Sequence, residues 1–130
     1  KARAEASYDR LLKVIAERAS GLDPARSERA LLLAVCMLCR RLTSGEAEHL
    51  IAQLPSKLWQ QLDQCTDGPD RTVTRQSICE EIARVLGIEA DRAGSVMAAV
   101  FDAVGEVVTP GQMAEVRGQL PDDMKPLFTA

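Results

Sequence analysis

Residues 30–39 are ALLLAVCMLC, an unbroken run of ten apolar residues between Arg29 and Arg40. A helix that is apolar on every side is buried, so the run predicts a central, mostly buried helix. Its start is marked by Asp23-Pro24, an N-cap acid followed by proline at the first helical position. Ten residues fall well short of the roughly 18 that a membrane span needs. The run therefore predicts the middle of a helical domain and no membrane partner.

The pattern around this run occurs twice along the chain. Gln53-Leu54-Pro55 recurs as Gln119-Leu120-Pro121, 66 residues later. The same offset pairs Thr43-Ser44-Gly45 with Thr109-Pro110-Gly111, and it places the apolar run opposite residues 96–101, VMAAVF. Agreement that keeps its order along the chain indicates an internal repeat.

Each half of the chain predicts four helices. The first helices cover about residues 5–19 and 75–86, and the second begin near residues 24 and 90. The third helices end near each Gln-Leu-Pro, and the fourth follow from Ser56 and Asp122. We expect an all-α fold of two tandem four-helix repeats related by a pseudo-two-fold axis. They form one compact helical bundle domain over residues 1–130, with repeats at about 5–65 and 74–128 and a linker at about 66–73.

Two local motifs recur around the third helices. Thr43 and Thr109 are each followed three residues later by Glu or Gln, which is the spacing of a capping box. Leu54 and Leu120 each precede a proline, and proline disfavours helix in the residue before it. We expect both leucines to lie buried at corners of the chain.

An apolar second helix, a Thr/Ser-Gly helix start and a Leu-Pro corner, each present twice, resemble a bacterial family catalogued as domain of unknown function 2267. The resemblance covers about Tyr8 to Phe128. It is most specific at residues 52–55, 109–111 and 119–121. The resemblance implies a duplicated all-helical fold and no known activity.

Composition excludes several classes of protein. The chain has 130 residues, of which 46% are apolar and 27% charged, typical of a folded domain and not of a disordered chain. The net charge of -3 makes nucleic acid an unexpected partner, because nucleic-acid binding usually requires a basic surplus. Residues 1–66 carry ten Lys/Arg and eight Asp/Glu, whereas residues 67–130 carry six and eleven. This asymmetry allows attraction between the halves or between copies, although drift between two solvated faces is the favoured explanation.

Four cysteines are the first candidates for redox or metal chemistry. Cys36 and Cys39 have Cys-x-x-Cys spacing, but they lie inside a predicted apolar helix and far from the N-terminus, where a helix lowers a thiol pKa. Cys65 and Cys79 are isolated along the chain. We therefore expect four reduced cysteines, no metal site, no cofactor, no catalytic residue and a cytoplasmic location.

Six side chains are candidate partner-binding residues. Tryptophan is enriched at interface hot spots, although the single tryptophan also suits the edge of a core. The arginines suit a phosphate or an acidic partner, although arginine near a helix C-terminus also stabilises the helix dipole. The single histidine is expected to be solvated. The candidates are Arg26, Arg29, Arg40, Arg41, His49 and Trp59.

These observations leave three classes of function open. We expect a non-enzymatic helical module that binds another protein or a second copy of itself, in an interaction or regulatory role. The first alternative is a small-molecule-binding bundle, which needs an apolar cavity between the central helices, or an enzyme, which a pocket between the halves lined by His49 or Asp102 would favour. The carboxylates of Asp102 and Glu106 lie four residues apart on one helix face and are expected to be solvated. The further alternative is nucleic-acid binding by the Arg-rich first half, which needs the four arginines on one exposed face.

Overall fold

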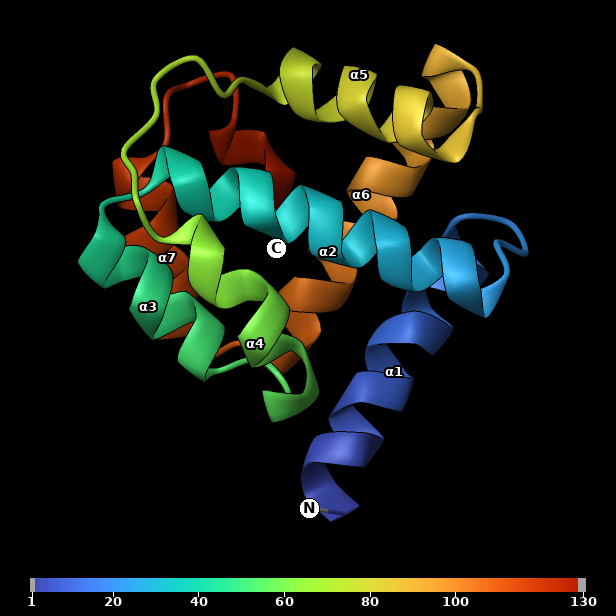
Figure 1. Cartoon of the computed structure of the whole chain (residues 1–130), viewed down its shortest axis with the longest axis horizontal. Helices are drawn as coiled ribbons and strands as arrows, with labels where there is room; N and C mark the ends of the chain where they lie inside the picture. Colours follow the sequence, from blue (N-terminus) through green and yellow to red (C-terminus); the bar gives the residue numbers. More distant parts are fainter. Residues whose placement is uncertain (1, 129–130) are drawn as a thin grey trace.

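All regular secondary structure in residues 2–128 is helical in the computed structural model, which describes those residues and the side chains from Ser7 onward (Figure 1). The α-helices are α1 (Ala2–Arg18), α2 (Pro24–Arg41), α3 (Ser44–Ala52), α4 (Trp59–Leu62), α5 (Arg75–Leu86), α6 (Ala90–Val107) and α7 (Pro110–Gln119). The 3-10 segments are η1 (Ser56–Leu58), η2 (Asp63–Cys65) and η3 (Lys125–Phe128). The prediction of an all-α fold is confirmed.

Local sequence signals account for most helix ends. The carboxylate of Asp23 accepts a hydrogen bond from the backbone N–H of Arg26 at 2.8 Å, which caps the N-terminus of α2. Helix α5 ends at Gly87, whose φ of 66° is left-handed and therefore suits glycine. A full capping box joins Thr74 and Ser77 at the start of α5, with serine in place of the usual Glu or Gln at the third helical position.

The prediction of four helices in each half is not confirmed, because the described residues form four α-helices in the first half and three in the second. After Pro55, the first half has only the single turn α4 between η1 and η2. After Pro121, the second half has only the short segment η3. Pro126 lies within η3 and has no backbone N–H to donate, so an α-helix beginning at Asp122 cannot continue through it.

The apolar runs lie in α2 and α6 and supply one continuous core. On α2, Leu31, Ala34, Val35 and Leu38 are fully buried, whereas the residues between them are half-buried. Helix α1 packs mainly along α6, in the other half of the sequence, and α5 contacts both α6 and α2 (Figure 1). The two halves therefore share their core. Within residues 2–128, no helix has both the length and the apolarity needed to cross a bilayer.

Both Leu-Pro corners are buried, as predicted. Leu54 and Leu120 are each 3% exposed. The predicted linker lies against the C-terminal end of α2, where the backbone N–H of Asp70 donates to the carbonyl of Arg40 at 2.6 Å. A Cβ atom at Gly68 would lie 2.2 Å from that same carbonyl oxygen, so only glycine allows the linker to approach this closely.

Candidate functional site

Helices α3 and α7 are joined by two reciprocal hydrogen bonds. The backbone N–H of Thr109 donates to the Gln53 amide oxygen at 2.9 Å, and the backbone N–H of Thr43 donates to the Gln119 amide oxygen at 3.0 Å. Each glutamine of the repeated Gln-Leu-Pro therefore caps a helix in the other half of the chain. We call these contacts the glutamine clamps.

The glutamine clamps correct the capping-box prediction. Thr43 and Thr109 do accept from the backbone N–H of Glu46 and Gln112, at 3.3 and 3.2 Å. The return bonds that would complete the boxes are replaced, because the N–H of each threonine is bound by the distant glutamine. The recurrence of glutamine at equivalent positions of the repeat indicated a shared role for Gln53 and Gln119. The spacing alone did not show which helix each glutamine caps.

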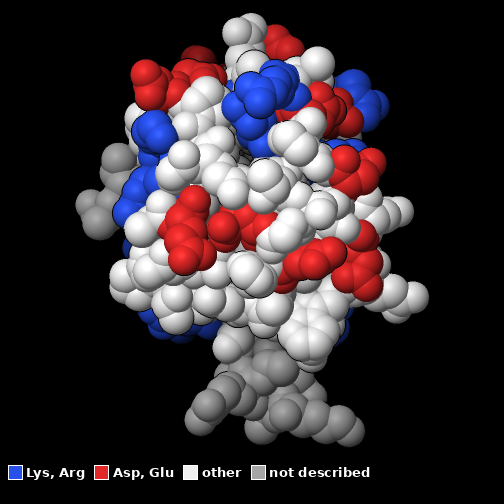
Figure 2. Space-filling model, turned by 90° about the vertical axis from the view of Figure 1, so that its left-hand side faces the viewer, with Lys and Arg blue, Asp and Glu red and all other residues white. Residues whose placement is uncertain are grey.

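The clamped helices bring three potential metal ligands together. Glu46 and His49 lie one turn apart on α3, and Glu115 comes from α7. One ligand atom from each residue lies within 4.8 Å of the others. The Gln112 amide nitrogen donates to the Glu46 carboxylate. Acidic side chains gather across the face that α3 and α7 form, as Figure 2 shows.

Trp59 is the one large hydrophobic side chain of the described part of the chain that is exposed, at 42%. Its indole N–H donates to the carbonyl oxygen of Leu54 at 2.8 Å, so the buried corner fixes the ring. The indole lines a groove of about 370 Å³. The other lining residues are Glu48, Ile51, Ala52, Asp63 and Thr66. We call this hollow the Trp59 groove.

A second groove, of about 330 Å³, lies where α1, α6, α7 and η3 meet. Its apolar part includes Phe101 and Phe128, whose rings meet edge to face with centroids 5.1 Å apart. Its polar part includes Asp102, which accepts from Arg18 at 3.1 Å, and Glu106. Arg18 also pairs with Glu106 at 3.2 Å, so both carboxylates form ion pairs at the surface. The lining residues include no serine, cysteine or histidine among those described.

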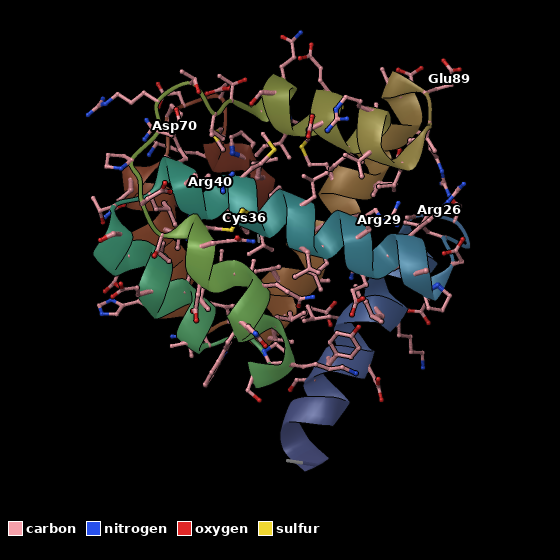
Figure 3. All side chains as sticks on the ribbon, in the orientation of Figure 1. Arg26, Arg29, Cys36, Arg40, Asp70 and Glu89 are labelled. Carbon is pink, nitrogen blue, oxygen red and sulfur yellow. A yellow bond between two sulfur atoms is a disulfide. The ribbon has the colours of Figure 1, made fainter. Side chains whose placement is uncertain are left out.

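The four candidate arginines of α2 are not brought together. Figure 3 shows Arg26 and Arg29 at one end of α2 and Arg40 at the other, next to Arg41 in sequence. At about 1.5 Å per residue, the two ends are separated by roughly 20 Å. Arg26 lies 3.9 Å from the Asp23 carboxylate, and Arg40 lies 3.8 Å from that of Asp67. The single basic face that nucleic-acid binding would need is not formed by these residues.

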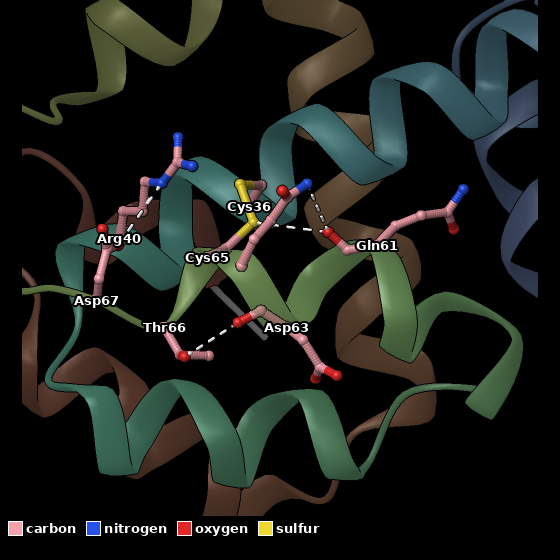
Figure 4. The surroundings of a disulfide bond; sticks show 8 residues. Cys36, Arg40, Gln61, Asp63, Cys65, Thr66 and Asp67 are labelled. Carbon is pink, nitrogen blue, oxygen red and sulfur yellow. Dashed lines mark hydrogen bonds and ion pairs between the residues drawn. A yellow bond between two sulfur atoms is a disulfide. The ribbon is translucent and has the colours of Figure 1, made fainter.

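The prediction of four reduced cysteines is wrong. Cys36 forms a disulfide with Cys65, which ties α2 to η2 (Figure 4). Packing of η2 against α2 brings the two Cα atoms to 5.2 Å, within the range a disulfide requires. The Cys-x-x-Cys spacing pointed to Cys39 as the partner of Cys36, but Cys39 remains a free buried thiol. The cytoplasmic location drawn from reduced cysteines therefore loses its basis.

Burial raises the pKa of the Cys39 thiol to about 12. The thiol therefore stays protonated at neutral pH and is a poor nucleophile and a poor metal ligand. Neither redox nor metal chemistry is supported at the Cys-x-x-Cys pair.

Comparison with known proteins identifies one family. The model of a family described as uncharacterized conserved protein (DUF2267) matches residues 8–127, nearly the whole chain. No curated protein matches the chain.

Proposed function

The chain belongs to the DUF2267 family, and we propose from its own surface that it is a non-enzymatic protein-interaction module. The proposed partner is another protein, which presents a basic segment with an adjacent apolar residue to the Trp59 groove. The observation that carries the proposal is the exposed, fixed indole of Trp59 beside two carboxylates.

The apolar part of the Trp59 groove supplies the anchor for such a segment. Tryptophan is among the residues that most often dominate binding energy, particularly at the centre of a recessed surface. The hydrogen bond to Leu54 holds the ring in place before binding, so little side-chain freedom is lost on association. Ile51 and Ala52 extend the apolar surface beside the ring.

The charged residues of the Trp59 groove determine which charge the bound segment of the partner should carry. Glu48 and Asp63 are both exposed and both line the groove, so two negative charges share it with the indole. A Lys or Arg side chain places its aliphatic stem against the ring and its cationic end near a carboxylate. An acidic segment would be repelled by the same pair.

A displayed peptide library of random sequence tests the proposal. We expect the wild-type protein to enrich peptides that contain Lys or Arg next to an aliphatic residue. Trp59→Ala should weaken binding of an enriched peptide by about 30-fold, which corresponds to the roughly 2 kcal/mol of a hot spot. Gln60→Ala is the matched control, because Gln60 is an exposed neighbour that does not line the groove.

Three results would contradict this function. Enrichment of acidic peptides would refute the assignment of charge. Equal binding by the wild type and Trp59→Ala would place the interaction elsewhere. Self-association abolished by Trp59→Ala, measured by sedimentation, would identify a second copy of the chain as the occupant.

A second candidate function, small-molecule binding, is favoured by the groove that Asp102 lines. Phe101 and Phe128 provide an apolar wall, and Arg117, which pairs with no carboxylate among the described residues, adds a positive charge to the lining. An organic acid with a ring or aliphatic body fits this chemistry. A thermal-shift screen of such acids tests it, with Arg117→Gln expected to abolish any stabilisation. An enzyme is the weaker form of this candidate, because the carboxylates in the groove are already paired with Arg18.

We also propose that the two halves are duplicated units related by a pseudo-two-fold axis within one domain. The glutamine clamps support this relation, because they exchange equivalent contacts between α3 and α7. The crossed packing of α1 on α6 and of α5 on α2 supports it as well. Superposition of the halves in a crystal structure tests the relation.

A further inference from the structure

We propose that Glu46, His49 and Glu115 form a binding site for a divalent transition-metal ion, with zinc as its best probe. The site lies between α3 and α7 and is separate from the Trp59 groove. None of its three ligands lines the Trp59 groove. It revises the expectation from sequence that the chain has no metal site.

The donor set is mixed, which distinguishes it from an ordinary acidic surface. One imidazole and two carboxylates are ligands that zinc accepts, with water completing the coordination. An imidazole nitrogen favours transition metals over magnesium and calcium, which prefer oxygen ligands. The chain contains a single histidine, and it is the one that meets two carboxylates.

The three ligand atoms are slightly too far apart to bind one ion as they stand, and small rotations of the side chains bring them to the required distances. Their ligand atoms lie within 4.8 Å of one another. Ligands about 2.1 Å from a tetrahedral ion lie roughly 3.4 Å apart. His49 and Glu115 are exposed, so their rotamers are free to close this difference and solvent ions have access.

Electrostatics favours a cation at this position. Two carboxylates this close repel each other, and that repulsion is relieved by a positive charge between them. Among the described side chains, neither Glu46 nor Glu115 forms an ion pair with lysine or arginine. A bound metal ion supplies the charge that the protein does not.

A buried amide holds one of the ligands in place. Gln112 is 8% exposed, and its amide nitrogen donates to one oxygen of Glu46. Its amide oxygen in turn accepts from Gln53 at 3.4 Å. Contacts of this kind orient metal ligands, and their loss typically weakens metal binding by about 10- to 100-fold. The glutamine clamps thus connect the ligand Glu46 to the joint between the two halves.

Calorimetric titration of metal-free protein with zinc chloride tests the site. We expect one equivalent of zinc to bind to the wild type. His49→Ala and Glu115→Gln should each weaken binding by about 100-fold or more, because each removes a ligand itself. Asp122→Asn is the control, since it removes an exposed carboxylate that lies outside both the cluster and the Trp59 groove. Circular dichroism establishes that the variants remain folded.

The single histidine allows a second, independent measurement. Zinc should shift the imidazole nitrogen resonances of His49 in the wild type, with no shift in Glu115→Gln at the same zinc concentration. Zinc should also raise the midpoint of thermal unfolding of the wild type, because it links α3 to α7.

Clear outcomes would overturn the proposal. Absence of zinc binding by the wild type would do so. Unchanged affinity in His49→Ala would also do so, as would loss of binding in Cys79→Ser, which would assign the zinc to a thiol. Loss of peptide binding in Trp59→Ala with zinc binding intact would leave this proposal supported, so the two proposals fail separately.

Discussion

Replacing the two clamp glutamines tests whether the repeated Gln-Leu-Pro joins the halves. Gln53→Ala removes the acceptor for the backbone N–H of Thr109, and Gln119→Ala removes the acceptor for that of Thr43. A hydrogen bond contributes about 0.5 to 1.5 kcal/mol net to stability. Both threonines are exposed, so water replaces the lost acceptor in part. We therefore expect each substitution to lower the free energy of unfolding by about 1 kcal/mol.

The double substitution is the sharper measurement. Gln53 also donates to Gln112, which donates to Glu46, the residue whose backbone N–H binds Thr43. Sites in one hydrogen-bond network usually depart from additivity by about 0.5 kcal/mol or more. We expect the double variant to differ from the sum of the single variants by at least that amount.

Urea unfolding followed by circular dichroism measures all three variants. Gln60→Ala serves as the control, because it removes an exposed glutamine amide outside the clamps. If both single variants and the double variant match this control within about 0.3 kcal/mol, well below the worth of a hydrogen bond, the clamps hold nothing together. The repeated glutamine would then need another explanation.

Three further predictions concern the core, the disulfide and the single tyrosine. Leu54→Ala and Leu120→Ala should each cost about 2 to 5 kcal/mol in thermal melts, with Leu120→Ala the milder. Losses below about 1 kcal/mol at both sites would remove their scaffold role. Cys65→Ser should cost about 3 to 4 kcal/mol in urea unfolding, from the 29-residue separation of the bonded cysteines. Thiol titration of the denatured, unreduced protein should find Cys39 and Cys79 only, and four reactive thiols would refute the bond. Burial and the hydrogen bond to Glu28 raise the Tyr8 pKa from 10.0 to about 12, so its phenolate absorbance should appear near pH 12. Stability from Tyr8 should be complete below pH 10 and lost as the pH rises through 12 in the wild type but not in Tyr8→Phe; absorbance appearing at pH 10 would refute the shift.

The candidate site was only partly visible in the sequence. Trp59 was singled out by residue type, but its exposure and its groove depend on how α4 packs beside α3. His49 was expected to be a solvated surface histidine, and it is exposed. Its approach to Glu115 requires two helices 66 residues apart in sequence to meet, which no local pattern specifies.

Local physics determined the helices from the sequence alone. The N-cap at Asp23, the left-handed glycine at position 87 and the buried leucines of the two corners follow from side-chain chemistry within a few residues. The repeat showed that the halves share a pattern. The repeat did not show that α1 packs more extensively along α6 than along α2. That packing depends on which central helix offers α1 the better-fitting surface, and spacing along the sequence does not contain this information.

Only the tertiary structure decided the contacts that join distant parts of the chain. The disulfide formed with Cys65 and not within the Cys-x-x-Cys pair, because η2 packs on α2. The glutamines cap helices in the opposite half, because α3 and α7 meet there. Hydrogen bonds and disulfides act over a few ångströms, so their partners are set by which elements pack together. That packing is a property of the whole core, whereas caps and turns are properties of a few neighbouring residues.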